Sequence, residues 1–408
     1  MKICIVATGY PRWKGDFDST YLHQLSKNLV KLGVEVHVIA PHAKNAHVEE
    51  IIDGVHIHRF RYMYPDKFET LAYFPGIPEN IKKRFSKLQV LPFVISMTIN
   101  LFKLTKKHKF DIINPHWIIP SGWITTGTIF KTPIITTIYG ADLTLPINKY
   151  PFLKVFLEKS LLKSDGIISI STFTKKYALN NFLEISEESI KVVPYGVDDK
   201  YFIPPSLKNT ENKFDTNYTI MTCGRLVERK GIKYLIESMV EVLKKFPKTK
   251  LIIVGDGPEK NNLVEYSKKL GILENIEFLG AVHEEILPKW YKSCDLFVLP
   301  SIVDSSGDTE GLGLVLVEAM ASAKPVIGTN VGGIPDIISK NSDYGYLIDQ
   351  KNPKELSVKI IEILSNDIKR IEMGTNAYYT AKNKFSWENV AKEYVNIFQN
   401  ISEDSLKK

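Results

Sequence analysis

Cysteine is scarce in this chain: three residues among 408, none of them in a paired or Cys-x-x-Cys arrangement. Cys4, Cys223 and Cys294 each lie in or beside a short apolar run that is typical of a strand. A framework held together by disulfides is therefore not expected. Buried free thiols in a reducing cytosol fit this pattern best.

Long apolar segments are also lacking. The first residues, MKICIVATGYPRW, place charge and apolar side chains as a first strand would, and the apolar run ends too early for the core of a signal peptide. The stretch 88–102 has 15 residues without charge. A membrane-spanning helix needs ~20, and Pro92 is expected to interrupt this one. We therefore predict a cytoplasmic protein without a transmembrane helix.

Acidic residues are missing from one segment. Residues 1–110 carry 17 Lys and Arg against 9 Asp and Glu, and the surplus peaks in 81–110, which has eight basic residues and no acidic one. Two interpretations stay open: a basic, apolar helix that contacts an anionic membrane surface, or an ordinary core helix with solvated ends. Because apolar residues interleave with the charges, without exposed stacking motifs, nucleic acid is not expected as a partner.

The chain does contain an alternation of strand-like and helical segments. Its length and its 44% hydrophobic content favour two globular domains. The alternation predicts α/β domains with mostly parallel sheets covered by helices on both faces. The strand candidates are 2–8, 34–41, 54–60, 111–116, 133–140, 166–171 and 190–196, then 218–226, 250–257, 275–280, 294–301 and 324–333.

Between these two groups of strands, residues 197–219 lose apolar periodicity and are rich in Pro, Asn and Lys, which is typical of a linker. We place the domain boundary there. Ligands of open parallel sheets bind beyond the carboxyl ends of the strands, so functional residues are expected in the loops that follow strands.

The segment 300–333 holds the most informative pattern. Glu310 and Glu318 stand eight residues, or about two helical turns, apart around a Gly-rich turn that enters a helix near Gly313. Gly311 and Gly313 let the backbone approach a ligand, and the amides at the helix start attract a diphosphate. The carboxylates can then accept hydrogen bonds from sugar and ribose hydroxyls. The alternative is a pair of glutamates on a solvated helix face.

A second pattern, TCGRLVERKG, places Arg225 and Lys230 on either side of a short turn after a strand. Arginine binds phosphate oxygens in a bidentate manner and lysine acts as a compact charge. Together they suit one pyrophosphate and would stabilise the charge that grows on a departing diphosphate. The alternative is a pair of ordinary surface cations in a polar loop.

As a whole, the sequence resembles glycosyltransferase family 4, and the resemblance covers nearly all of the chain. The motifs that carry it occur in the order that the family shows. They are Gly15 in the loop after the first strand, NPHWIIPSG with His116, YGADL with Asp142, VVPYGVD (192–198), GRLVERKG with Arg225 and Lys230, VGDGPE (254–259), EGLGLVLVE with both glutamates, and FSWENVAKEY (385–394).

The resemblance implies a GT-B fold of two Rossmann-like domains that face each other across a cleft. The acceptor-side domain would span residues 1–197, completed by a returning C-terminal helix in 388–408, and the donor-binding domain 198–387. The implied activity is that of a retaining glycosyltransferase of the hexosyltransferase type. It would move a sugar from a nucleotide-diphosphate sugar to a glycan or lipid-linked acceptor, and the leaving diphosphate would receive the acceptor's proton on the same face. Neither a metal ion nor another cofactor is required.

The resemblance also implies residue roles. Arg225 and Lys230 should hold the donor diphosphate, Glu310 should contact the sugar ring, and Glu318 should bind the ribose. His116 should contact the transferred sugar and position it, without abstracting a proton. The remaining donor-side positions are Gly15, which should approach across the cleft, and Gly311, Gly313, Leu314 and Val315, whose backbone should meet the phosphates.

The chain departs from the family pattern at a few positions. Tyr139 stands where many relatives have the histidine of an HGxD-like segment near Asp142, on the acceptor side. A single glycine, Gly15, replaces the common pair, and Ala323 takes a position that is often glycine. Residues 16–18 have the Asp-x-Asp spacing of metal-dependent transferases, but Asp18 or Ser19 is expected to cap the helix that follows.

Three other functions remain as alternatives. A sugar-nucleotide epimerase or hydrolase could use the same fold, because a fold does not fix a function. A non-catalytic protein that binds nucleotide sugars is a different class, disfavoured by the presence of both cations and both glutamates. A nicotinamide dehydrogenase is disfavoured further, since neither GDGPEK nor GTNVGG forms a GxGxxG motif after a strand.

Overall fold

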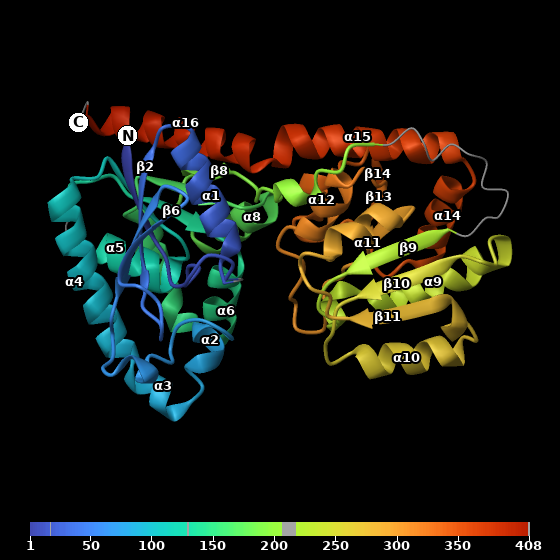
Figure 1. The fold of residues 1–408 in the computed structure, drawn as a ribbon, viewed down its shortest axis with the longest axis horizontal. Coiled ribbons are helices and arrows are strands. Elements are labelled where there is room, and N and C mark those ends of the chain that lie inside the picture. The colour runs from blue at the N-terminus through green and yellow to red at the C-terminus, as the bar shows by residue number, and fades with distance from the viewer. Residues whose placement is uncertain (17, 129, 206–217, 407–408) are drawn as a thin grey trace. The chain divides into compact units, whose positions relative to one another are not determined.

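The computed structural model describes residues 1–406 apart from residues 17, 129 and 206–217. The chain divides into two compact units, which are residues 1–196 together with 387–408, and residues 197–386. Most of the segment predicted as a linker, residues 206–217, lies outside the described residues. Each unit is an α/β structure with helices around a sheet (Figure 1).

The sheet of the first unit has the order β3-β4-β2-β1-β5, and its pairs are parallel except for β3 with β4. Two isolated bridges, from Ile113 to Ile134 and from His116 to Thr137, link β5 to a further parallel sheet, β6-β7-β8. The strands are β1 (Lys2–Val6), β2 (Glu35–Pro41), β3 (Glu49–Ile52), β4 (Val55–Phe60), β5 (Ile112–Pro115), β6 (Ile135–Ile138), β7 (Gly166–Ser169) and β8 (Ile190–Val192).

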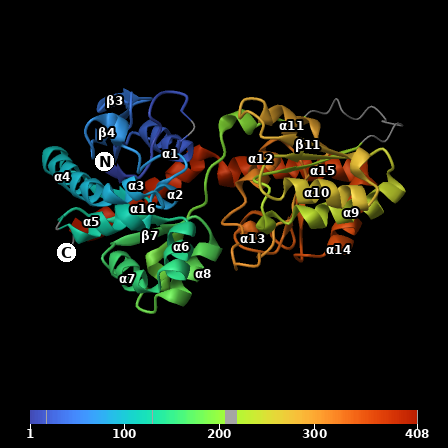
Figure 2. The same cartoon turned by 90° about the horizontal axis from the view of Figure 1, so that it is seen from below.

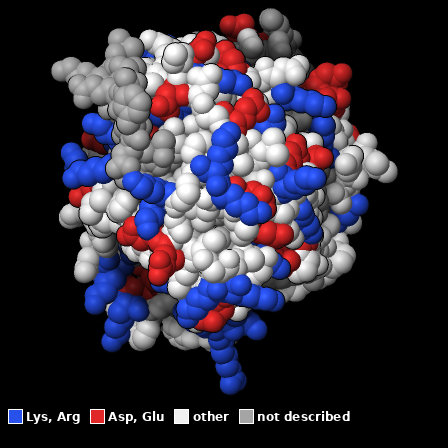
Figure 3. Space-filling view, turned by 90° about the vertical axis from the view of Figure 1, so that its right-hand side faces the viewer, with Lys and Arg blue, Asp and Glu red and all other residues white. Residues whose placement is uncertain are grey.

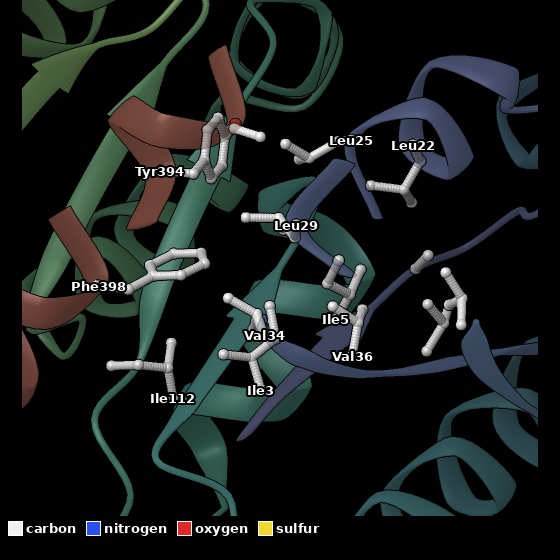
Figure 4. Packing of buried hydrophobic residues seen from close by; sticks show 14 of the residues in the cluster. Ile3, Ile5, Leu22, Leu25, Leu29, Val34, Val36, Ile112, Tyr394 and Phe398 are labelled. Atoms are coloured by element: carbon white, nitrogen blue, oxygen red, sulfur yellow. The ribbon is translucent and has the colours of Figure 1, made fainter. Parts of the chain in front are cut away.

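The main hydrophobic core of the first unit contains residues from the first strands and helix and from the last helix of the chain. Helix α1 (Thr20–Lys31) buries the leucines of its apolar face against β1 and β2, and α16 (Trp387–Leu406) adds Tyr394 and Phe398 to the same cluster (Figure 4). The apolar face of α1 recurs every three to four residues, as burial against a sheet requires. The predicted return of the C-terminal helix to the N-terminal domain is confirmed.

The basic segment 81–110 forms two helices, α3 (Arg84–Leu88) and α4 (Val90–His108). Pro92 lies in the first turn of α4, where a missing N–H breaks no hydrogen bond, so the expectation that it interrupts the helix is wrong. Helix α4 lies on the outside of the first unit in both views (Figures 1 and 2). The other helices of this unit are α2 (Ile77–Asn80), α5 (Trp123–Gly127), α6 (Ala141–Lys149), α7 (Lys154–Leu162) and α8 (Thr172–Asn181).

The second unit has a single parallel sheet with the order β11-β10-β9-β12-β13-β14. Its strands are β9 (Thr219–Cys223), β10 (Lys250–Val254), β11 (Ile276–Gly280), β12 (Leu296–Leu299), β13 (Val326–Thr329) and β14 (Gly345–Ile348). Its helices are α9 (Ile232–Lys245), α10 (Lys260–Lys269), α11 (Leu287–Ser293), α12 (Leu314–Ala321), α13 (Ile334–Ile337), α14 (Pro353–Leu364) and α15 (Asp367–Phe385). The apolar face of α9 packs on this sheet with α14.

The distribution of surface charge and the length of the helices indicate how the protein could meet a membrane. On the face seen in Figure 3, cationic and anionic side chains are interspersed. Several of the lysines pair with an acid three or four residues away, such as Lys244 with Glu241 and Lys268 with Glu265. Within the described residues, every helix is too short or too polar to cross a membrane.

Candidate functional site

The Gly-rich segment of the second unit starts α12 as the sequence predicts. Gly313 is the N-cap residue and has a φ of +94°, a left-handed conformation that glycine adopts without strain. Leu314 and Val315 form the first turn, whose N–H groups have no acceptor within the helix and carry a partial positive charge. A Cβ atom at Gly332 would lie 1.9 Å from the carbonyl oxygen of Glu310, so this glycine lets the two loops touch. The result is a turn whose exposed N–H groups could attract an anion behind Glu310 and Gly311.

Two sequence-predicted residues meet in a partly buried ion pair. Lys230, in the short 3-10 helix Glu228–Lys230 after β9, donates to Glu310, with Nζ 2.5 Å from Oε2. The side chains retain only 11% and 13% of their exposure. The guanidinium of Arg229 lies 3.6 Å from the same oxygen, while Arg225 is exposed in the loop after β9. The pair places a compact cation and a carboxylate next to each other, where one ligand could contact both.

Glu318 occupies a different environment from Glu310. It lies in α12, where its Oε2 accepts a hydrogen bond of 2.7 Å from the hydroxyl of Tyr291 on α11. Burial raises the pKa of Glu318 to about 7. Tyr201 packs edge-on against Tyr291, with ring centroids 5.7 Å apart. Glu318 is therefore poised to change charge near neutral pH, and its carboxylate becomes a strong acceptor only as the pH rises.

In the first unit, His116 is held from both sides. Its Nε2 lies 2.8 Å from Oδ1 of Asn114, and its Nδ1 is hydrogen-bonded to the hydroxyl of Tyr139. The amide nitrogen of Asn114 donates to Ile135 O, so Oδ1 is an acceptor and Nε2 must donate to it. In a neutral ring, Nδ1 then accepts from Tyr139. Burial lowers the pKa of His116 to about 3, which keeps the ring neutral.

The predicted acceptor-side residues surround this histidine. Asp142, in the first turn of α6, accepts hydrogen bonds from the backbone N–H groups of Tyr139 (2.9 Å) and Ile118 (3.3 Å). Burial raises its pKa to about 6. Tyr139 also stacks on Tyr195, with centroids 5.5 Å apart. Asp142 thus fixes the loop that carries Tyr139, and Tyr139 fixes His116.

A largely apolar cavity of about 520 Å³ adjoins these residues in the first unit. Asp142 and Trp117 line it, and so do the loop after β1 and the segment around α2. Its lining includes the charged residues Asp18 and Lys82 as well as Asp142. The apolar lining includes Tyr73, Phe74, Ile77, Ile119, Pro146 and Leu153. The cavity can bind a mainly hydrophobic group beside a few polar atoms.

The loop between β1 and α1 differs from the sequence prediction in how the helix is capped. Ser19 stands at the N-cap of α1, but its side chain makes no capping bond and donates instead to Asp18, at 2.7 Å. The capping role predicted for Asp18 or Ser19 is therefore wrong. Arg12 donates to both oxygens of Asp16, at 2.7 and 2.8 Å, and so neutralises it. Phe17, the middle residue of the Asp-x-Asp spacing, lies outside the described residues, and Gly15 is exposed with a φ of +87°.

Comparison with known proteins assigns the family. Residues 205–380 match the family of glycosyl transferases group 1, and residues 19–201 match Glycosyltransferase Family 4. An uncharacterised glycosyltransferase of Methanocaldococcus jannaschii is 28% identical over 98% of both chains. The chain belongs to glycosyltransferase family 4.

Other similarities agree with this family and its fold. The chain is 31% identical, over 59% of its length and 65% of the relative's, to a GDP-mannose-dependent monoacylated alpha-(1-6)-phosphatidylinositol monomannoside mannosyltransferase of Corynebacterium glutamicum. HepE of Anabaena, solved in complex with UDP, superposes with a TM-score of 0.69 at 18% identity over 98% of this chain and all of that one. This glycosyltransferase therefore has the GT-B fold, with two α/β domains built on parallel sheets.

The sequence of this glycosyltransferase does not predict several of the residues that contact the site residues. Tyr291 lies 27 positions before Glu318, in a short helix whose spacing gives no signal of a buried hydroxyl. Asn114 is part of the quoted NPHWIIPSG motif, but the orientation of its amide toward His116 is set by hydrogen bonds from its nitrogen to Ile135 and Thr137 of β6. Arg229 could have been added to the cation pair, since it lies within the same motif. Ala323, at the position where glycine is expected from the family pattern, has a φ of +55°, a left-handed conformation that glycine adopts more readily.

Proposed function

We propose that this glycosyltransferase takes its sugar from a nucleotide-diphosphate sugar bound by the second unit. The observation that carries the proposal is the ion pair of Lys230 with Glu310, three residues before the N-cap of α12. A cation and a helix N-terminus are the groups that would bind a diphosphate, and a carboxylate is the group that would accept hydrogen bonds from a sugar. The names of two similar proteins, one dependent on GDP-mannose and one in complex with UDP, support this donor class.

Donor binding would use the ion pair without breaking it. An ammonium has three donors, so Lys230 can keep its bond to Glu310 while it binds a phosphate oxygen. The free oxygen of Glu310 accepts from a sugar hydroxyl. Arg225 and the first-turn amides of α12 share the growing charge of the leaving diphosphate, and Glu318 accepts from the ribose.

Transfer would proceed with retention of configuration. The bond from the anomeric carbon to the phosphate oxygen breaks while the acceptor oxygen bonds to the same face, and the acceptor's proton passes to the leaving phosphate. His116 does not serve as the base, because its Nδ1 accepts from Tyr139 and burial lowers its pKa to about 3. Both of its ring nitrogens bond to protein groups, so the predicted contact of His116 with the transferred sugar would require it to give up one of these bonds. NMR of the product's anomeric centre tests this step, and an inverted product would contradict it.

The transfer would need no metal ion. The residues present do not suit one at the Asp-x-Asp spacing, because Arg12 already donates to both oxygens of Asp16. Asp18 is a separate group, whose side chain accepts from Ser19 and lines the apolar cavity. Lys230 and the N-terminus of α12 supply the positive charge that a metal supplies in other transferases.

The acceptor would carry an apolar part and be presented at an anionic membrane surface. The 520 Å³ cavity offers the apolar lining. Helix α4 leaves a stripe of large apolar side chains exposed, at Leu91, Ile95, Ile99 and Phe102, while its other face is buried. Lysines flank both ends of this stripe, as in helices that lie on anionic lipid. Of the two interpretations of segment 81–110, the exposed stripe favours the membrane contact.

Co-sedimentation with anionic vesicles tests this surface. Wild type should bind at low salt and be released by high salt, and the variant Leu91→Ser/Ile95→Ser should bind at least tenfold less. Val358→Ser, at an exposed apolar position of α14, is the matched control and should bind like wild type. Equal binding by all three proteins would contradict the assignment.

The donor itself is found by a thermal-shift screen of nucleotide sugars, because a ligand of the folded state raises the melting temperature. Incubation of the stabilising donor without an acceptor then separates the alternatives. A transferase leaves it largely intact, whereas a hydrolase or an epimerase converts it. Rapid conversion without acceptor, or no stabilisation by any nucleotide sugar, would contradict the proposal.

A further inference from the structure

Four histidines of the first unit gather on one face of its sheet, away from every residue assigned to donor or acceptor. His37 on β2 is opposite His56 on β4, and His58 lies two residues further along on the same face. His108 ends α4, which packs over these strands. The ring of His37 stacks on His56 and on His58, with centroids 4.7 and 5.2 Å away, and lies 4.3 Å from that of His108.

Three of these rings direct nitrogen atoms to one point. His37, His58 and His108 each offer one ligand atom, and all three atoms lie within 4.8 Å of one another. His37 Nδ1 and His58 Nε2 are 2.9 Å apart. Ligands of a tetrahedral Zn²⁺ at ~2.1 Å are ~3.4 Å from each other, so small side-chain adjustments bring the three atoms to that geometry.

A carboxylate lies beside the outer nitrogen of two of the rings, as a hydrogen bond at His37 and as an ion-pair contact without hydrogen-bond geometry at His58. Glu35 Oε1 is hydrogen-bonded to His37 Nε2 at 2.9 Å, and Glu49 Oε2 lies 2.5 Å from His58 Nδ1. A carboxylate draws the ring proton to the nitrogen that it contacts. When both neutral rings carry their protons on these outer nitrogens, His37 Nδ1 and His58 Nε2 face each other with lone pairs, which a cation between them would satisfy. Carboxylates orient metal-bound histidines in the same way.

The environment of His108 favours a metal ion over a proton shared between His37 and His58. Its Nε2 is buried and has no hydrogen-bond partner within the described residues. A proton between His37 and His58 would leave this third nitrogen unsatisfied, whereas a metal ion would bind it as well. Buried polar atoms without a partner are rare in proteins because of their desolvation cost.

We propose that His37, His58 and His108 bind one divalent transition-metal ion of the Zn²⁺ type, with Glu35 and Glu49 orienting two of the rings. Three imidazoles suit Zn²⁺, Cu²⁺ or Ni²⁺, and leave a fourth position for water. The ion ties the end of α4 to β2 and β4. Its role is structural and lies outside the transfer reaction, so it is independent of the donor and acceptor proposed above.

Calorimetric titration of Zn²⁺ into metal-stripped full-length protein without a histidine tag tests the site. Wild type should bind one ion per chain, and His108→Ala should bind it at least tenfold more weakly. That variant loses no hydrogen bond of Nε2, so it should fold. His47→Ala, at an exposed histidine of the same unit, should match wild type. Absence of binding by wild type, or equal affinity in His108→Ala and His47→Ala, would overturn the proposal.

Spectroscopy and stability give readouts that do not depend on activity. Co²⁺ in place of Zn²⁺ should show the intense visible absorption of a tetrahedral site in wild type and in His47→Ala, and lose it in His108→Ala and in a second variant, His58→Asn. Zn²⁺ should raise the melting temperature only where that absorption is present. The same spectrum in all four proteins would overturn the assignment, whatever the fate of the transfer reaction.

Discussion

The two units differ in the charge and polarity of the sites that they offer to their predicted ligands. In the second unit, the site is charged and preformed: Lys230 pairs with Glu310 in front of a helix N-terminus. In the first unit, the site is neutral, with His116 bonded on both sides and an apolar cavity next to it. Loss of a charge in the second unit should therefore damage the chemical step, whereas changes in the first unit should affect the handling of the acceptor more gently.

The largest effect is expected for Lys230→Ala. It removes a contact to the leaving diphosphate and leaves Glu310 without its lysine partner. A charge-assisted bond of this kind is worth about 1.5–3 kcal/mol, so turnover should fall well over tenfold. The measurement is the initial rate with saturating donor. Lys269→Ala, an exposed lysine of α10 in the same unit, should keep the rate of wild type.

Glu310→Gln should cause the second-largest loss of turnover. The amide keeps the shape of the side chain but loses the charge that supports Lys230 and the sugar in the transition state, so turnover again falls more than tenfold. Glu228→Gln, at an exposed glutamate that begins the 3-10 helix of Lys230, is the matched control. A near-normal rate in Glu310→Gln would remove this residue from the site.

Glu318→Ala should weaken donor binding severalfold and slow the chemistry less. In wild type, the carboxyl of Glu318 has a pKa raised to about 7, so it is protonated and accepts poorly below that pH. Donor affinity should thus increase as the pH rises from 6 to 8, and this pH dependence should disappear in Glu318→Gln. Titrations at both pH values check it, and a pH dependence that survives in the variant would assign it to another group.

In the neutral site, Tyr139→Phe should reduce acceptor-dependent turnover only severalfold. It removes the hydroxyl that donates to His116 Nδ1 and leaves the stacking on Tyr195 in place. The melting shift caused by the donor should stay as in wild type. A donor shift that vanishes together with turnover would place Tyr139 in donor binding and weaken the contrast between the units.

The smallest effect is expected for removal of metal ions. Initial transfer rates at 25 °C in EDTA should equal those in its absence, because Arg12 occupies Asp16 and, in the proposed site, cationic protein groups would serve the diphosphate. Any loss of Zn²⁺ from the histidine cluster should appear as a lower melting temperature instead. Loss of activity in EDTA with recovery on Mn²⁺ would contradict this account.

Much of the fold could be predicted from apolar runs. Continuous runs such as KICIV and KLIIV form central parallel strands, because only a strand buried on both faces tolerates them. Two strands could not be found this way. The sequence of β3, EEII, is half-exposed and antiparallel at the sheet edge, and β14, GYLI, is four residues long. Strand β3 lacks the apolar signal because none of its side chains is fully buried, and β14 is too short to give a clear one.

The site residues were predictable where the chemistry is local in sequence. Gly313 and the start of α12 followed from the Gly-rich pattern itself. Contacts between distant segments were not predictable, among them Lys230 with Glu310, 80 positions apart, and Tyr291 with Glu318. The histidines at 37, 58 and 108 show no metal-ligand spacing, because the sheet register and the end of α4 bring them together.

The central claim is that the charged site of the second unit binds a nucleotide-diphosphate sugar. Calorimetric titration of the donor found by thermal shift into wild type, Lys230→Ala and Lys269→Ala tests it most directly. The account predicts tight binding by wild type and Lys269→Ala, and at least tenfold weaker binding by Lys230→Ala. Equal affinity for all three proteins would contradict it.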